Sequence, residues 1–322
     1  MKNKLRIKRI LAILLCSVSV VLQASAEAIA AGSPAPTVPE TDRSKENVLF
    51  IKTIADFQEF QKNCMEDRYS IGLTVRLETD LDFRGISFCP VPIFCGTFQG
   101  NGHTLCGIVI EGSEAPAGVF RIVEAGGIVD GVTVQASVIP SGDKKEAGGI
   151  AGINRGTIRN CTFQGTAEAL ETLGGIAGIN EEGGIIEHCL NDAALDGKRK
   201  IGGIAGENSG SIRFCTNRGK INVLGKEIDE EEDRDTLPSF AFPTMDDGRE
   251  IAMGRSLGGD KDEEEIDLDA EKVRDVGGVA GLSSGVIESC SNEGEVGYPR
   301  IGYNMGGIAG RQSGQLLNCS NH

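Results

Sequence analysis

Histidine, the residue most often used for acid–base catalysis and metal binding, occurs only at His103, His188 and His322 of this 322-residue chain. A zinc peptidase needs the order H-E-x-x-H, and the pair Glu187-His188 lacks the second histidine. No serine lies in a G-x-S-x-G motif, and no glycine-rich stretch leads into the G-K-S or G-K-T of a phosphate-binding loop. The sequence therefore predicts no catalytic residue, no metal ligand and no cofactor.

Paired carboxylates are the other arrangement that could do chemistry, because glycosidases need two acids on one face and some lyases need a calcium site. Asp80 and Asp82 lie two residues apart and so share a strand face, and Asp130 is a third candidate. The chain has no tryptophan and three tyrosines, so no aromatic platform for sugars is evident. We expect these acids to be turn and surface residues, and a carbohydrate-active enzyme is the alternative.

A strongly acidic segment at 225–275 could also bind calcium. Its carboxylates include Asp260, Asp262, Asp267 and Asp269. An EF-hand loop that started at Asp260 would need glycine at its sixth position, where this chain has Glu265. With few large apolar residues and no clear period, the segment is predicted to be a solvated, disordered insertion without a metal.

The N-terminal residues indicate export, and the net charge limits the possible partners. Residues 1–26 have a basic start, an apolar run at Ile10–Leu22 and small residues before Glu27, which predicts signal cleavage near Ala26. The net charge is −15, and the signal carries five of the positive charges. Such acidity argues against nucleic acid and anionic membranes as partners, and the mature chain is not expected to insert into a membrane.

The secondary-structure elements that carry the candidate residues are predicted from a sequence repeat. The pentapeptide G-G-I-A-G or G-G-V-A-G occurs five times, and each copy is followed by a cysteine at a similar distance. The pentapeptides start at Gly148, Gly174, Gly202, Gly277 and Gly306. The cysteines are Cys161, Cys189, Cys215, Cys290 and Cys319. Short repeats rich in turn residues leave no room for a helix and predict two or three short strands per repeat, stacked as a parallel β-helix.

Stacking explains which residue types repeat. Successive coils lie about 4.8 Å apart, so a side chain at a corner glycine would clash with the next coil or forbid a positive φ. Asn154, Asn180 and Asn208 share an offset and predict an amide ladder, which Ser283 and Gln312 replace later. The cysteine column is expected to be buried, free and inert. A local disulfide among Cys89, Cys95 and Cys106 remains open.

The N-terminal part supplies a linker and a cap. Residues 27–47 are rich in Pro, Ala, Ser and Thr, as linkers are. At 48–68 we predict a capping helix, because Thr53 and Asp56 form a capping-box pattern before apolar residues at helical spacing. Residues 69–322 are then the β-helix, interrupted at 225–275. A cap is needed because the first coil would otherwise expose backbone and core.

The segments GTFQGNGHTLCGIVIEG and AGVFRIVEAGGIVDGVTV, followed by the pentapeptide coils, resemble bacterial surface proteins with GLUG-type repeats. Similar coils flank the protease module of immunoglobulin A peptidases. The resemblance implies an all-β, right-handed parallel β-helix on an exported, adhesin-like bacterial protein. It does not imply peptidase chemistry, because the chain lacks H-E-x-x-H.

Our primary hypothesis is a secreted or cell-surface, non-enzymatic β-helix with an adhesin-like binding or surface-scaffold role, whose partner is a host or bacterial surface glycan or protein. A carbohydrate-active enzyme is one alternative, and an N-terminal fragment of a larger surface protein is another. The last repeat stops partway through a coil at Cys319–His322. This predicts either a partner or self-association at that end, or a natural chain that continues.

Overall fold

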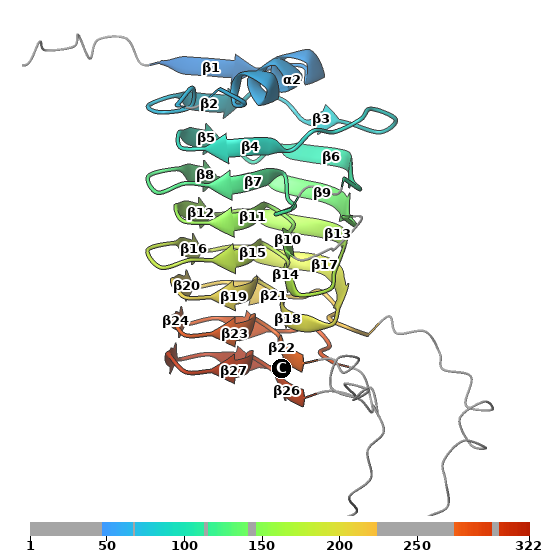
Figure 1. Cartoon of the computed structure of the whole chain (residues 1–322), viewed down its shortest axis with the longest axis vertical. Helices are drawn as coiled ribbons and strands as arrows, with labels where there is room; N and C mark the ends of the chain where they lie inside the picture. Colours follow the sequence, from blue (N-terminus) through green and yellow to red (C-terminus); the bar gives the residue numbers. More distant parts are fainter. Residues whose placement is uncertain (1–46, 67, 113–114, 141–145, 224–273, 298–302) are drawn as a thin grey trace, which may run out of the picture. The chain divides into compact units, whose positions relative to one another are not determined.

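The computed structural model describes residues 47–66, 68–112, 115–140, 146–223, 274–297 and 303–322. Within them the strands pair in parallel and form four sheets, which run along a stack of coils (Figure 1). Most repeats therefore contribute four strands instead of the predicted two or three, because the double glycine separates two strands that the sequence pattern does not distinguish. The predicted parallel β-helix is confirmed.

The four sheets are named here A to D. Sheet A consists of β1 (Val48–Ile51), β2 (Thr74–Leu77), β5 (Thr97–Gln99), β8 (Ile128–Asp130), β12 (Thr157–Arg159), β16 (Ile185–Glu187), β20 (Ser211–Arg213), β24 (Val286–Glu288) and β28 (Gln315–Leu317). Sheet B consists of β3 (Leu81–Asp82), β6 (Thr104–Ile110), β9 (Thr133–Val138), β13 (Thr162–Ala169), β17 (Leu190–Gly197), β21 (Thr216–Asn217), β25 (Ser291–Asn292) and β29 (Ser320–Asn321).

Sheets C and D flank the double glycine. Sheet C consists of β4 (Val91–Phe94), β7 (Phe120–Val123), β11 (Ala151–Asn154), β15 (Ala177–Asn180), β19 (Ala205–Asn208), β23 (Ala280–Ser283) and β27 (Ala309–Gln312). Sheet D consists of β10 (Glu146–Gly148), β14 (Thr172–Gly174), β18 (Arg199–Gly202), β22 (Arg274–Gly277) and β26 (Tyr303–Gly306). The registers join equivalent residues of successive repeats, as Gly148 with Gly174 shows.

The helix α2 (Ile54–Asn63) covers the first coils (Figure 1). Its capping box is confirmed: the Thr53 hydroxyl accepts from the Asp56 backbone N–H, and the Asp56 carboxylate accepts from the Thr53 N–H. Phe57 and Phe60 are fully buried against phenylalanines of the first coils. The helix is shorter than the predicted 48–68, since its N-cap is Thr53 and residues 48–51 pair with β2 instead.

The pentapeptide glycines are required for close approach and not for backbone conformation. None of them has a positive φ, so that part of the expected explanation is wrong. A Cβ on Gly149 would collide with the Phe163 ring and the Gly175 carbonyl. Left-handed residues lie elsewhere, and one of them directly precedes each cysteine of the column.

Two ladders of buried amides run along the stack. The predicted ladder is confirmed, because Asn154 Nδ2 donates to Asn180 Oδ1 at 2.7 Å and Asn180 Nδ2 donates to Asn208 Oδ1 at 2.8 Å. A second ladder was not predicted. It joins Asn191, Asn217, Asn292 and Asn321, with 2.7 Å between successive amide groups. Each ladder fixes the register of its sheet, since a shift by one residue would leave buried amides without partners.

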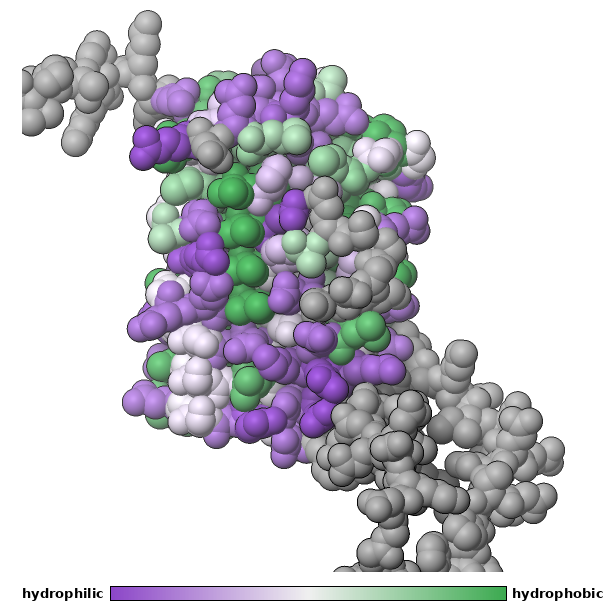
Figure 2. All heavy atoms as spheres, in the orientation of Figure 1, coloured by the Kyte–Doolittle hydropathy of each residue, from purple (hydrophilic) through white to green (hydrophobic). Residues whose placement is uncertain are grey.

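The outer face of sheet C carries one apolar column. Ile93, Ile122, Ile153 and Ile179 occupy paired positions on successive strands. Figure 2 shows a vertical run of hydrophobic residues on an otherwise largely polar face. Aliphatic pairs across neighbouring strands stabilise a sheet, so this column contributes to the fold without being in the core.

Several predicted segments lie outside the described residues: the signal peptide, nearly all of the linker and most of the acidic insertion, with Asp260, Asp262, Asp267 and Asp269. The insertion boundary at 275 is wrong, because β22 begins at Arg274. Asp275 is a buried corner residue, and its carboxylate accepts from Arg311 Nη2 at 2.6 Å. In the part of the chain that is described, no helix has the length and hydropathy needed to span a membrane.

Candidate functional site

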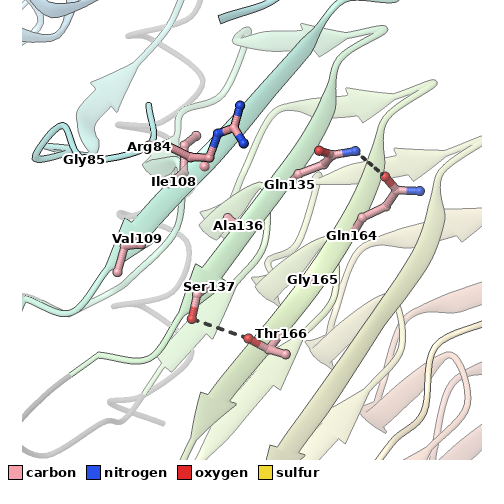
Figure 3. A pocket seen from close by; sticks show the side chains of 11 residues that line it. Arg84, Gly85, Ile108, Val109, Gln135, Ala136, Ser137, Gln164, Gly165 and Thr166 are labelled. Carbon is pink, nitrogen blue, oxygen red and sulfur yellow. Dashed lines mark hydrogen bonds between the residues drawn. The ribbon is translucent and has the colours of Figure 1, made fainter. Parts of the chain in front are cut away.

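A groove of about 570 Å³ lies on the outer face of sheet B, over the coils that contain β6, β9 and β13 (Figure 3). Strand alternation places Gln135 and Ser137 of β9 on this face, and Gln164 and Thr166 of β13 beside them. Arg84 lies at the rim next to β6. The groove therefore crosses neighbouring coils, and its lining combines these four uncharged polar side chains with Val109, Ala136 and glycine backbone.

The hollow results from a bulge and from small residues. The pairing of β6 with β9 shifts between Leu105 and Ile108, so the strand bends at Gly107, whose φ is +70°. A Cβ on Gly107 would lie 2.5 Å from the Arg84 side chain. Gly165 has a φ of +119°, which a residue with a side chain rarely adopts. Each glycine is thus required locally, and together they leave the strand backbone accessible from the groove.

Two short side-chain ladders line the groove (Figure 3). Gln135 Nε2 donates to Gln164 Oε1 at 2.9 Å, and Gln164 Nε2 donates to Asp192 Oδ2 of β17 at 3.3 Å. The Thr166 hydroxyl donates to the Ser137 hydroxyl at 3.4 Å. These amides and hydroxyls have further donor and acceptor capacity, and they repeat at the coil spacing of about 4.8 Å. Such a surface can hydrogen-bond a polymer that runs along the stack.

The one charged residue that lines the groove is already paired. Arg84 Nε donates to both carboxylate oxygens of Asp82, at 2.8 and 2.9 Å. These hydrogen bonds lower the pKa of Asp82 to about 2. Asp82 is therefore ionised at physiological pH and forms an ion pair with Arg84. The residues that line the groove thus include no protonated carboxylic acid that could donate a proton.

The other candidate acids have different partners. Asp80 accepts from the Thr104 backbone N–H at 2.8 Å and contacts His103 Nδ1 at 3.1 Å, and these bonds lower the pKa of Asp80. Asp130 belongs to sheet A, where it accepts from Arg159 and Asn160. The structure therefore does not place Asp130 on the face that carries Asp82.

The cysteine column lies inside the stack. Cys161, Cys189, Cys215 and Cys290 are buried, and all nine described cysteines are free thiols. Burial raises the pKa of Cys189 well above its ordinary value, so this thiol stays protonated and unreactive. The burial expected for the column is confirmed for these four thiols, whereas Cys319 is half-buried.

The local disulfide considered among Cys89, Cys95 and Cys106 is wrong. Cys89 precedes β4 of sheet C, Cys95 lies between sheets C and A, and Cys106 is at the bulge of β6 in sheet B. The three residues therefore belong to different parts of the coils, and each is a free thiol.

Sequence reasoning missed the groove and one aromatic pair. Gln164 and Thr166 follow Cys161 by three and five residues, an offset that places both on the outer face of sheet B. The rings of His188 and Phe214 stack, with centroids 5.0 Å apart and planes 9° from parallel. His188 and Phe214 are one repeat apart in the sequence, and this spacing could have predicted the contact.

Comparison with known proteins gives limited matches. No family model matches the chain. Halomucin of Haloquadratum walsbyi is 28% identical over 149 residues, which are 42% of this chain and 2% of that protein. A crystal structure from Bacteroides ovatus, provisionally described as an immunoglobulin A1 protease, is 15% identical with a TM-score of 0.49, covering 84% of this chain and 74% of that one. The chain thus spans a small part of halomucin.

Proposed function

We propose that this protein is an exported, non-enzymatic β-helix repeat protein that binds neutral glycans of host or bacterial surfaces. The observation that carries the proposal is the groove on sheet B, where the Gln135–Gln164 and Ser137–Thr166 ladders present amides and hydroxyls on successive coils. Sugars are hydrogen-bonded through such groups. A neutral ligand fits better than an acidic one, because the chain has a net charge of −15.

Export and surface location are part of the proposal. They are supported by the basic and apolar pattern of residues 1–26 and by the resemblance to GLUG-type repeats.

A binding role is favoured over catalysis because of the state of the acids. A glycosidase needs one carboxylic acid with a raised pKa and a second carboxylate within about 5–9.5 Å. The pKa of Asp82 and that of Asp80 are both lowered, by Arg84 and by the Thr104 backbone respectively. Neither acid is protonated at neutral pH, so neither supplies the proton for a leaving group.

The test is calorimetric titration of the protein with cellohexaose, mannohexaose, chitohexaose and maltohexaose. We expect binding of at least one of them and a loss of about tenfold in affinity in the double variant Gln135→Ala, Gln164→Ala, equivalent to about 1.4 kcal/mol. The matched control is Gln315→Ala, which removes an exposed glutamine from sheet A. Equal affinity of the double variant and the control would refute the groove as the binding site.

A further inference from the structure

One corner of the coil carries a column of left-handed residues. It joins sheet A to sheet B directly before the cysteine column, and each of its members has a φ between 51° and 53°. The members are Asn160, His188, Phe214, Ser289 and Asn318. Asparagine adopts this conformation several-fold more readily than most residues with side chains, whereas a bulky residue there is an outlier. His188 and Phe214 therefore need a reason other than backbone preference.

Core packing does not supply that reason. Phe214 is 49% exposed and His188 is exposed, so neither ring contributes a buried surface comparable to that of the core phenylalanines. Their rings stack on each other across successive coils at 5.0 Å. An unfavourable backbone conformation that is retained at an exposed site points to function.

In the His188–Phe214 pair, each ring contacts its partner through one face. The other face of each ring points toward the next residue of the corner column. Beyond Phe214 that member is Ser289, whose side chain is too short to cover a ring. Beyond His188 it is Asn160, whose Nδ2 donates to Asp130 Oδ1 at 2.8 Å. Neither neighbour adds a third ring to the pair, and because Phe214 is half exposed and His188 is exposed, part of each ring remains accessible to a ligand.

The aromatic pair adjoins the surface that contains the groove. His188 lies two residues before β17 and Phe214 two residues before β21, so both strands of sheet B start beside it. The glutamine ladder of the groove ends on Asp192 of the same β17. A polymer that lies along sheet B can thus reach the groove and the aromatic pair together.

We propose that the His188–Phe214 stack is a second sugar subsite, on which the apolar face of a neutral pyranose ring packs while the rest of the glycan occupies the groove. This inference rests on the proposed function. The C–H groups on one face of a pyranose suit the electron-rich face of an aromatic ring. Hydroxyls of Thr216 and Ser291, which contact each other at 3.1 Å on the adjoining strands, are hydrogen-bonding groups for the sugar rim.

The test replaces each ring by the residue that the corner prefers. Phe214→Asn and His188→Asn remove the platform and should leave the thermal midpoint unchanged or raised, because Asn160 and Asn318 already occupy this conformation. In the titrations with the four hexasaccharides, we expect each variant to bind at least tenfold more weakly than the unmodified protein. Phe214→Tyr keeps a ring and should bind within twofold, as should the control Asn318→Ser at the end of the column.

The outcomes separate the two proposals. Undiminished affinity in Phe214→Asn, with loss in the Gln135→Ala, Gln164→Ala variant, would overturn the aromatic subsite and leave the groove intact. A lowered thermal midpoint in Phe214→Asn and His188→Asn would show that the rings serve the fold, and would also overturn the subsite. If the unmodified protein binds none of the four hexasaccharides, the proposed function fails and the subsite fails with it.

Discussion

The second amide ladder gives a sharp test of what holds the coils in register. Asn217 is fully buried at its centre. Its Oδ1 accepts from Asn191 Nδ2 and its Nδ2 donates to Asn292 Oδ1, both at 2.7 Å. Within its own turn it also donates to the Gly219 carbonyl and accepts from the Gly219 N–H. Asn217→Ala removes these four hydrogen bonds together.

The expected loss follows from how many partners remain satisfied. Asn191 Nδ2 keeps the Ala193 carbonyl at 3.3 Å, and the Gly219 N–H keeps the Asn191 carbonyl at 3.2 Å. The substitution therefore removes the net stabilisation of the four hydrogen bonds. It adds only part of the free-energy penalty for burying polar groups without partners, because some of the former partners stay hydrogen-bonded. At roughly 0.5–1.5 kcal/mol per bond, Asn217→Ala should lower the free energy of unfolding by about 4 kcal/mol. The exposed Asn321 accepts one ladder bond, so Asn321→Ala should cost roughly 1 kcal/mol or less.

The measurement is urea unfolding followed by far-ultraviolet circular dichroism for the two variants and the unmodified protein. Asn217→Asp adds a second comparison, because its carboxylate would face the Asn292 Oδ1 acceptor and should destabilise more above the carboxyl pKa than below it. If Asn217→Ala and Asn321→Ala cost the same, the ladder does not stabilise the stack and the register argument is refuted.

Three further predictions concern stability. Gly203→Ala should prevent cooperative folding, because the new Cβ would strike the Gly278 carbonyl. In the control Gly183→Ala the new Cβ meets open space, so the variant should lose only about 1–2 kcal/mol of unfolding free energy because of its φ of +84°. Thermal unfolding measures both variants. Arg311→Ala should cost about 2 kcal/mol in urea, since it removes the ion pair of the buried Asp275, and an added Asp275→Asn should recover part of that loss. Burial raises the pKa of Cys64 from 9.0 to about 12, so the contribution of this thiol to stability should be constant below pH 9.0 and fall between there and about pH 12 by roughly 1 kcal/mol per unit. Because the buried Cys189 thiol adds to the total slope, the quantity to measure is the difference in unfolding free energy between the unmodified protein and Cys64→Ala, and a difference that does not change with pH would contradict the assignment.

The sequence predicts the inner columns well because stacking repeats them. A pentapeptide that recurs every coil marks the same corner each time, and Asn154, Asn180 and Asn208 keep one offset. The second ladder is harder to see, since the first repeat has Phe163 where the ladder continues with Asn191. The division into four strands is hidden because one strand ends at the first glycine of the pair and the next begins at the alanine of the same pentapeptide, without any apolar alternation.

The groove could not be predicted because it depends on departures from the repeat. The bulge at Gly107 belongs to a coil without the pentapeptide, and Arg84 comes from an earlier loop that no periodicity places. The boundary at Asp275 was misjudged for a related reason. Its carboxyl continues an acidic run in sequence, while its φ of 58° and its pairing with Arg311 make it a corner of the next coil.

Inward-facing columns of residues determine the fold, whereas outward-facing columns are free to serve binding. The left-handed corner is fixed by the buried cysteine that follows it and by the ladder asparagine two residues further, so its own side chain is not needed for folding. A bulky residue there costs about 1–2 kcal/mol, which the flanking hydrogen bonds offset. Phe214 is tolerated at this corner because Cys215 and Asn217 determine the local backbone.

The same reasoning applies to Gln135 and Gln164, which alternate with core residues of sheet B and can vary without changing the register. Outward positions are thus the ones that selection can change toward a ligand, and the residues proposed for binding all lie there.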